Sequence, residues 1–74
     1  MPIHVGETYQ HYKGNYYRIL ALAKHTETLE DLVVYEDLNH EHTWVRPYSM
    51  FVEFVELENG KQVPRFKKIT NQQL

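Results

Sequence analysis

The pair His25 and Glu27 is the sharpest candidate for chemistry in this sequence. On an extended segment, residues two apart project to the same side, so the imidazole and the carboxylate would lie within reach of each other. A carboxylate beside a histidine raises its pKa and orients its ring, as general acid–base catalysis requires. The alternative is that the pair holds a turn, which Thr26 and Thr28 favour because threonine hydroxyls bond readily to loop backbone. We favour this structural interpretation, because such pairs also occur in purely structural networks.

The residues His40 and His42 have the spacing of metal ligands, with Glu41 between them. Two imidazoles on one face can bind zinc, but a stable site needs three or four protein ligands. His4, His11 or His25 would supply a third ligand only through the fold. We therefore expect neither a physiological metal nor another cofactor.

Two arginines, Arg46 and Arg65, each lie next to a proline and to an apolar or aromatic residue. An arginine in such a place can hold a carboxylate or a phosphate with both arms of its guanidinium group. It can equally pair with Glu27, Glu36 or Glu53 and fasten the fold. We favour structural pairing, because the chain offers many acidic partners.

Aromatic residues make up 14% of the chain, with six Tyr, three Phe and one Trp. Such rings supply much buried area per residue in a small domain. They can also form a stacking surface for a base, a sugar or a peptide. We assign Trp44 to the core, because a domain of this size needs its area, and we expect surface rings at Tyr12, Tyr16 and Tyr48.

Length and charge exclude several classes of protein. Seventy-four residues make a single domain, 1–74, with an ordered core at about 6–69 and a polar tail at 70–74. The net charge of −2 gives no general attraction for nucleic acid or for anionic membranes. No apolar run approaches the roughly 20 residues of a membrane span, and residues 1–6 lack the features of a signal peptide. The absence of cysteine fits a reducing compartment, so we expect a cytoplasmic protein.

Short apolar runs separated by polar turn clusters predict β-strands. We expect strands at residues 9–12, 16–24, 31–38, 43–46, 52–57 and 62–66, and one helical turn at 48–51. The dipeptide Asn59-Gly60 predicts a hairpin with a type I′ turn, and Pro64 places the last strand at an edge or a bulge. Residues 67–74 are polar, and we expect them to fray.

The fold that these strands predict is all-β, mainly antiparallel. Five to six short strands cannot bury both faces of a flat sheet, whereas a small, partly open, SH3-like barrel closes round one core. A helix over residues 16–24 would also fit the apolar spacing there, and a compact α+β fold is therefore the alternative.

The order of several short motifs along the chain resembles a bacterial family known as domain of unknown function 1653. The likeness covers residues 6–69, and the motifs together are more specific than any one alone. They are Tyr9 with His11-Tyr12-Lys13-Gly14, His25-Thr26-Glu27-Thr28, Leu32-Val33-Val34-Tyr35, Trp44-Val45-Arg46-Pro47, Met50-Phe51 and Pro64-Arg65-Phe66. The resemblance implies a small, mostly β, bacterial domain and brings no established reaction or catalytic residue.

We expect a non-enzymatic module that binds a small molecule, a peptide or a protein, as a monomer or a weak homo-oligomer. The motifs and the local chemistry together predict the ligand-binding residues His11, Lys13, His25, Glu27, Thr28, Tyr35, Trp44, Arg46 and Arg65. One alternative is a small hydrolase or isomerase in which His25 is the base and Glu27 orients it. Another is a scaffold that associates through an open strand edge near Pro64.

Overall fold

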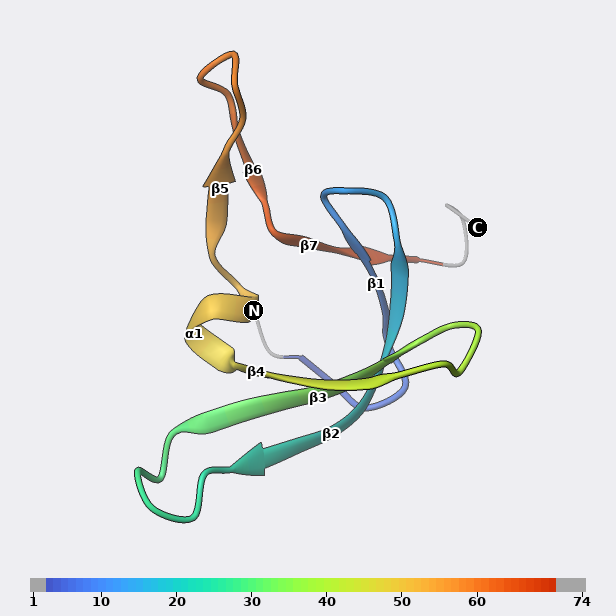
Figure 1. Cartoon of the computed structure of the whole chain (residues 1–74), viewed down its shortest axis with the longest axis vertical. Coiled ribbons are helices and arrows are strands. Elements are labelled where there is room, and N and C mark those ends of the chain that lie inside the picture. The colour runs from blue at the N-terminus through green and yellow to red at the C-terminus, as the bar shows by residue number, and fades with distance from the viewer. Residues whose placement is uncertain (1–2, 71–74) are drawn as a thin grey trace.

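The computed structural model of the chain describes residues 3–70. Strands dominate this part of the chain, and one short helix interrupts them (Figure 1). The elements in chain order are β1 (Thr8–His11), β2 (Tyr16–Lys24), β3 (Asp31–Asp37), β4 (Thr43–Pro47), α1 (Tyr48–Phe51), β5 (Phe54–Glu56), β6 (Gln62–Pro64) and β7 (Phe66–Ile69). The prediction of a mainly antiparallel β fold is thus confirmed.

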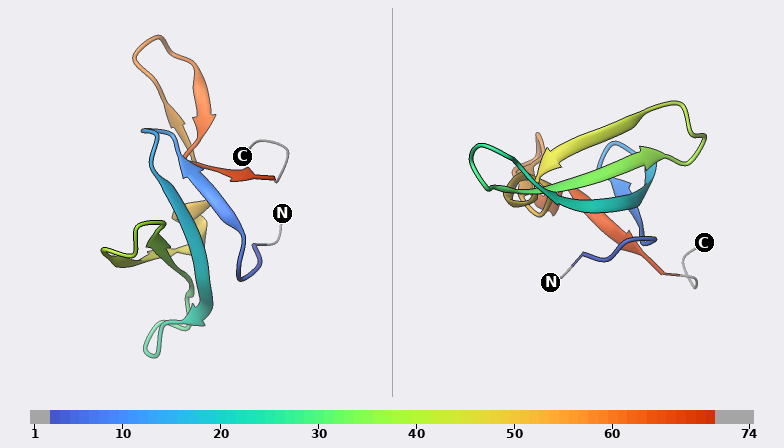
Figure 2. Two further views of the ribbon diagram at one scale, coloured as in Figure 1. Left: turned by 90° about the vertical axis from the view of Figure 1, so that its right-hand side faces the viewer. Right: turned by 90° about the horizontal axis from the view of Figure 1, so that it is seen from below.

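Five strands form one antiparallel sheet in the order β4-β3-β2-β1-β7, and β5 and β6 form a separate two-stranded sheet. The larger sheet curls, since its two outermost strands approach each other: Arg46 on β4 has its guanidinium carbon 5.6 Å from the ring centre of Phe66 on β7. A register shift between Ile19 and Ala21 contributes to the bend, because a bulge increases the local twist of a strand. Figure 2 shows β2 running from the β1 side of the molecule to the β3 side. The sheet is open rather than a closed barrel.

The helix considered for residues 16–24 is absent, because this segment is the strand β2 over its whole length. It pairs with β1 on one side and with β3 on the other, and these pairings satisfy its backbone. The α+β alternative is therefore wrong. The closer likeness to an SH3 barrel stays a prediction.

The hairpin between β5 and β6 is confirmed, but its predicted turn type is wrong. The backbone N–H of Gly60 donates to the carbonyl of Leu57 at 2.9 Å, and the backbone N–H of Leu57 donates to the carbonyl of Lys61 at 2.8 Å. The tight turn is therefore one residue earlier in the chain than expected. Gly60 has φ = 83°, whereas Asn59 is not in the positive-φ region that a type I′ turn requires. The hairpin is thus a turn followed by a glycine bulge, and Gly60 is needed for its left-handed conformation.

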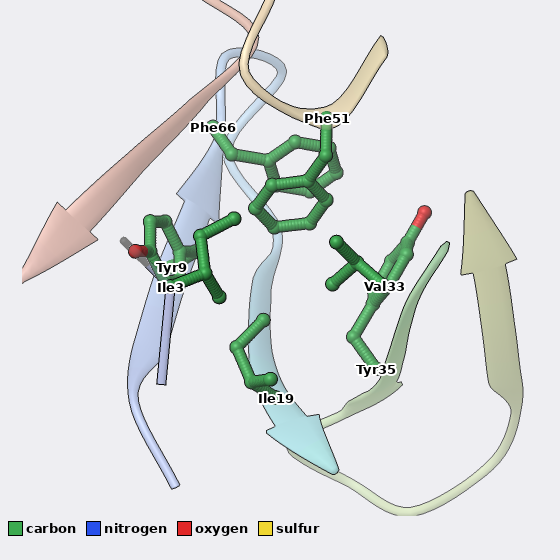
Figure 3. Packing of buried hydrophobic residues seen from close by; sticks show 7 residues of the cluster. All are labelled: Ile3, Tyr9, Ile19, Val33, Tyr35, Phe51 and Phe66. Atoms are coloured by element: carbon green, nitrogen blue, oxygen red, sulfur yellow. The ribbon is translucent and has the colours of Figure 1, made fainter. Parts of the chain in front are cut away.

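The core is a cluster of aromatic and branched side chains on the concave face of the curled sheet (Figure 3). At its centre the ring of Phe51 from α1 stacks on that of Phe66, with 4.0 Å between the ring centres and 4° between the planes. The ring of Tyr35 meets both edge-on, at 5.4 Å from each. The helical turn α1, predicted at 48–51, thus has one evident role, which is to bring Phe51 over the sheet. The other buried members of the cluster are Ile3, Tyr9, Ile19 and Val33.

Two predictions about burial and order are wrong. Trp44 does not lie in the core, since 46% of its surface is exposed. Residues 66–69, most of which were expected to fray, form β7, which pairs with β1 along its length. Phe66 and Ile69 are buried there, and Lys67 and Lys68 lie between them. The two lysines make this edge strand difficult to recognise in the sequence. The polar tail expected at 70–74 lies outside the described residues except for Thr70.

Candidate functional site

Four predicted site residues, His11, Tyr35, Arg46 and Arg65, come from different parts of the chain and meet around Phe66. His11 is directly opposite Phe66 in the pairing of β1 with β7, and their ring centres are 5.0 Å apart. The guanidinium of Arg46 lies over the ring of Phe66, and Arg65 immediately precedes it in the chain. We call His11, Tyr35, Arg46, Arg65 and Phe66 the Phe66 cluster.

The register of the sheet explains why Arg46 faces inward. Arg46 is opposite Val33, which is completely buried, and residues directly opposite in an antiparallel pair project to the same face. Its guanidinium donates a hydrogen bond to the hydroxyl of Tyr35, two residues from Val33. Burial raises the pKa of Tyr35, and the charge of Arg46 works in the opposite direction. Tyr35 is thus a neutral partner, and the positive charge of Arg46 meets no carboxylate among the described contacts.

Arg65 joins the small sheet to the large one. Its backbone N–H donates to the backbone carbonyl of Glu53 at 2.9 Å, and its own carbonyl accepts the backbone N–H of Tyr12, also at 2.9 Å. Its Nη2 donates to Glu53 Oε1 at 2.8 Å, which is one of the pairings that the sequence offered. The Nε of Arg65 is also buried, yet it has no hydrogen-bond partner in the described structure. An unsatisfied buried donor of a charged group is costly, and a hydrogen-bond acceptor at this atom would remove that cost.

His11 adds a third donor to the cluster. Its Nδ1 accepts the backbone N–H of Lys13 at 3.2 Å, which assigns the proton of the neutral ring to Nε2. Burial lowers the pKa of His11, and the nearby charges of Arg46, Arg65 and Lys13 lower it further. The ring is therefore neutral at pH 7. It presents an Nε2–H donor without adding a charge to the two arginines.

The segment His25–Thr28 lies elsewhere, at the tip of the hairpin between β2 and β3 (Figure 1). His25 Nδ1 accepts the backbone N–H groups of Glu27 at 3.1 Å and of Thr28 at 3.3 Å. Tyr17, whose ring centre is 5.9 Å from that of Phe66, begins a run of strand that ends at Lys24. Seven residues of strand span about 23 Å, so the hairpin tip is remote from the Phe66 cluster.

The structural interpretation of His25 and Glu27 is therefore the one that the contacts support. The imidazole bonds to the backbone of Glu27 and not to its carboxylate, so the pair does not form an acid–base couple. Thr28 Oγ1 accepts the backbone N–H of Glu30 at 3.2 Å and fastens the same turn. Most of the predicted patch thus falls into two groups, and only the Phe66 cluster gathers side chains from separate strands.

The remaining predicted residues lie at a third location or at the margin. Trp44 donates its indole N–H to Asp37 at 3.0 Å, and His42 approaches the second oxygen of that carboxylate at 3.4 Å. His40 faces Glu36 at 3.2 Å instead of joining His42. Within residues 3–70 no three His, Cys, Asp or Glu side chains form a group that could hold a metal ion. The ammonium of Lys13 lies 5.9 Å from the ring centre of Tyr12, beside the cluster.

Sequence reasoning missed Phe66 and Tyr17 as site residues. Both are aromatic, and both contact Tyr35 or each other edge-on at 5.3–5.9 Å. Phe66 sits in a motif that was singled out, Pro64-Arg65-Phe66, and Tyr17 begins the alternation with Ile19. Only the pairing of β7 with β1, however, shows that the ring of Phe66 lies beside His11.

Comparison with known proteins agrees with the resemblance seen in the motifs. The family model described as "Protein of unknown function (DUF1653)" matches residues 7–68, and the chain belongs to this family. It is also similar to a crystal structure of a DUF1653 protein from Bordetella bronchiseptica, with 34% identity and a TM-score of 0.76. That match covers 90% of this chain and 87% of the other. No curated protein matches the sequence significantly.

In the described part of the chain, no helix has the length and the apolar character that crossing a membrane requires. The four residues of α1 are far fewer than a membrane span needs.

Proposed function

We propose that this domain is a non-enzymatic binding module whose Phe66 cluster holds an anionic group of the ligand, a carboxylate or a phosphate. The observation that carries the proposal is the buried Nε of Arg65, which has no acceptor in the described structure. Arg46 and the neutral ring of His11 lie around the same phenyl ring and supply further donors. An anion would satisfy these donors together, and charge-assisted bonds of this kind are the strong ones.

The charge balance supports the same ligand chemistry. The two arginines of the cluster face one carboxylate, that of Glu53, which contacts Arg65 at 2.8 Å. One positive charge is therefore left over beside the buried rings of Phe66 and Tyr35, where a lower dielectric constant strengthens its attraction for an anion. This local surplus exists although the whole chain has a net charge of −2.

The alternative enzyme, with His25 as base and Glu27 as its orienter, has no support in the geometry of the hairpin tip. A binding role needs only the donors that the cluster already offers. A bacterial cytoplasmic location, an SH3-like fold and a monomeric or weakly associated state belong to the same proposal.

The test is an NMR titration of the full chain with inorganic phosphate and with acetate as probes. We expect shifts at His11, Arg46 and Arg65, including the side-chain Nε–H of Arg65, and none at residues 25–28. Arg46→Gln should weaken binding about tenfold to a hundredfold, because a hydrogen bond to a charged group is worth about 1.5 to 3 kcal/mol. Arg18→Gln is the matched control, since Arg18 is an exposed arginine outside the cluster.

Equal binding by the wild type and by Arg46→Gln would refute the proposal. The same would follow if Arg18→Gln lost as much affinity as Arg46→Gln. A circular dichroism spectrum of each variant shows whether the fold is retained.

A further inference from the structure

A second recognition site of opposite charge adjoins the Phe66 cluster but does not depend on it. A hollow of about 580 Å³ opens between the turn that joins β1 to β2 and the turn that joins β3 to β4. The residues that line it include Tyr16, Trp44, Asp37 and Glu41, and also Tyr17, whose ring packs on Tyr35 and Phe66 of the core. We infer that this hollow binds the guanidinium group of an arginine side chain in a peptide segment of a partner protein.

Two of the aromatic residues that line the hollow are exposed, and one of these two rings is held in place. Trp44 and Tyr16 expose 46% and 40% of their surfaces, although such large rings are usually well buried. The indole N–H of Trp44 donates to Asp37, and the ring of His42 lies 5.3 Å from the indole at a 40° tilt. A ring fixed in this way loses little side-chain entropy when a ligand stacks on it.

The charges around the hollow favour a cation. The residues that line the hollow include the two acidic residues Asp37 and Glu41 but no lysine or arginine. Lys13 precedes the lining residue Gly14, but its ammonium lies over the ring of Tyr12. The carboxylates alone would be a common feature of a surface turn. Their combination with the exposed rings of Tyr16 and Trp44 around one concave space is the feature that selects an organic cation.

A guanidinium suits this site better than a quaternary ammonium ion does. The planar guanidinium stacks on an aromatic face and offers five N–H donors at its edge. A quaternary ammonium ion has no donor, so it would cover the carboxylates of Asp37 and Glu41 without replacing their hydrogen bonds to water. The lysine ammonium donates but cannot stack as a plane. We therefore expect a preference for arginine over lysine and over tetramethylammonium.

The experiment uses the fluorescence of Trp44, which is the only tryptophan in the chain and lies in the wall of the hollow. The full chain is titrated with acetyl-Gly-Arg-Gly-amide and with matched peptides in which citrulline or lysine replaces the arginine. Citrulline has nearly the same shape as arginine but no charge. Tetramethylammonium chloride is the fourth probe.

We expect a saturable change in Trp44 emission with the arginine peptide, binding at least threefold weaker with the lysine peptide and tetramethylammonium, and no saturation with citrulline. Glu41→Gln should weaken the arginine peptide about threefold to tenfold, because it removes one charge and keeps the oxygen that accepts from Asn39. The matched control, Glu58→Gln, changes an exposed glutamate in the turn of the β5–β6 hairpin and should have no effect.

Equal binding of the arginine and citrulline peptides would overturn the inference, as would the lack of any saturable change with the arginine peptide. Equal binding of all three cations would overturn the choice of guanidinium. Failure here is distinct from failure of the anion site, because the probes have opposite charge and the variants lie in different clusters.

Discussion

The Phe66 cluster and the tip of the β2–β3 hairpin contain the same kinds of side chain but use them differently. At the hairpin tip, His25 accepts two backbone N–H groups from residues two and three positions further along the chain. In the Phe66 cluster, His11 and Arg46 come from β1 and β4 and reach a ring on β7. The first arrangement closes a turn, whereas the second depends on the whole sheet.

Similar motifs thus have different roles, depending on whether their side chains bond within their own turn or are brought together from distant strands by the pairing of the sheet. A polar residue that bonds to its own turn has little capacity left for a ligand, and its contribution is to local stability. Side chains that strands bring together from distant positions retain donors that no neighbour in the chain can satisfy. Such donors, here the Nε of Arg65, are the better guide to a binding site.

The largest effect should come from removing the ring that the cluster surrounds. Phe66→Ala should lower the free energy of unfolding by about 3 to 5 kcal/mol, because Phe66 is 7% exposed and stacks on Phe51. Phe54→Ala is the matched control, since Phe54 is 62% exposed, and it should cost less than about 1 kcal/mol. Urea denaturation measures both.

If Phe66→Ala leaves too little folded protein to measure, Phe66→Leu should still lower the free energy of unfolding by about 1 to 2 kcal/mol. Equal costs for the changes at Phe66 and Phe54 would contradict the central place of Phe66 in the core.

Glu7 extends the comparison to carboxylates. It accepts from the backbone of His4 at 2.9 Å, from Tyr9 at 3.1 Å and from Lys68 at 2.8 Å, whereas the carboxylate of Glu27 makes no such contact among the described residues. Burial acts to raise the pKa of Glu7, but these donors, together with the ring of His4, outweigh it and lower that pKa from 4.5 to about 2.

Because the pKa of Glu7 is lower in the folded state, its stabilisation is present above pH 4.5 and is lost as the pH falls toward about 2. Glu7→Gln should therefore lower the free energy of unfolding by about 1 to 2 kcal/mol at pH 7, and the difference from the wild type should vanish near pH 2. Unfolding curves at several pH values measure this. A difference that does not change with pH would be inconsistent with an ionised, hydrogen-bonded Glu7.

A smaller effect is expected at the hairpin tip. His25→Ala should lower the free energy of unfolding by about 1 kcal/mol, because two backbone N–H groups lose their acceptor. His25→Asn should recover part of this loss, since an asparagine side chain can accept a backbone N–H two residues further on. Phosphate binding should be unchanged in both variants. Weaker phosphate binding in the folded His25→Asn domain would place the hairpin tip in the site.

The smallest effect is expected for Glu27→Gln. Its carboxylate makes no hydrogen bond or ion pair in the described structure, so the free energy of unfolding should change by less than about 0.5 kcal/mol. A loss above 1 kcal/mol would indicate that the carboxylate, and not only the backbone N–H of Glu27, contributes to the turn.

Alternating and β-branched residues made the main strands predictable from the sequence. The segment at 16–24 is a strand with the predicted bounds, and Val33 and Tyr35 alternate into the core as a half-buried strand requires. The strand β7 was missed because Lys67 and Lys68 make it resemble a solvated tail. Its pairing with β1 uses backbone groups that carry no signature in the sequence.

The sequence identified most of the residues of the candidate site but not which of them lie together. His11, Arg46 and Arg65 stand in the motifs that the family resemblance singled out, but so do His25, Glu27 and Thr28. What separates the two groups is the order of strands in the sheet, which brings β4 and β7 together across the core. Trp44 was assigned to the core by its size, and the structure places it at the hollow beside Asp37 instead.

The most direct test of the account is the pKa of His11, measured by NMR titration of its ring in the ligand-free domain. Burial of the imidazole, together with the nearby charges of Arg46 and Arg65, predicts a pKa below 6.5, and Arg46→Gln should raise that pKa. A pKa at or above 6.5 that does not change in Arg46→Gln would show that the arginine does not reach His11, and would contradict the Phe66 cluster itself.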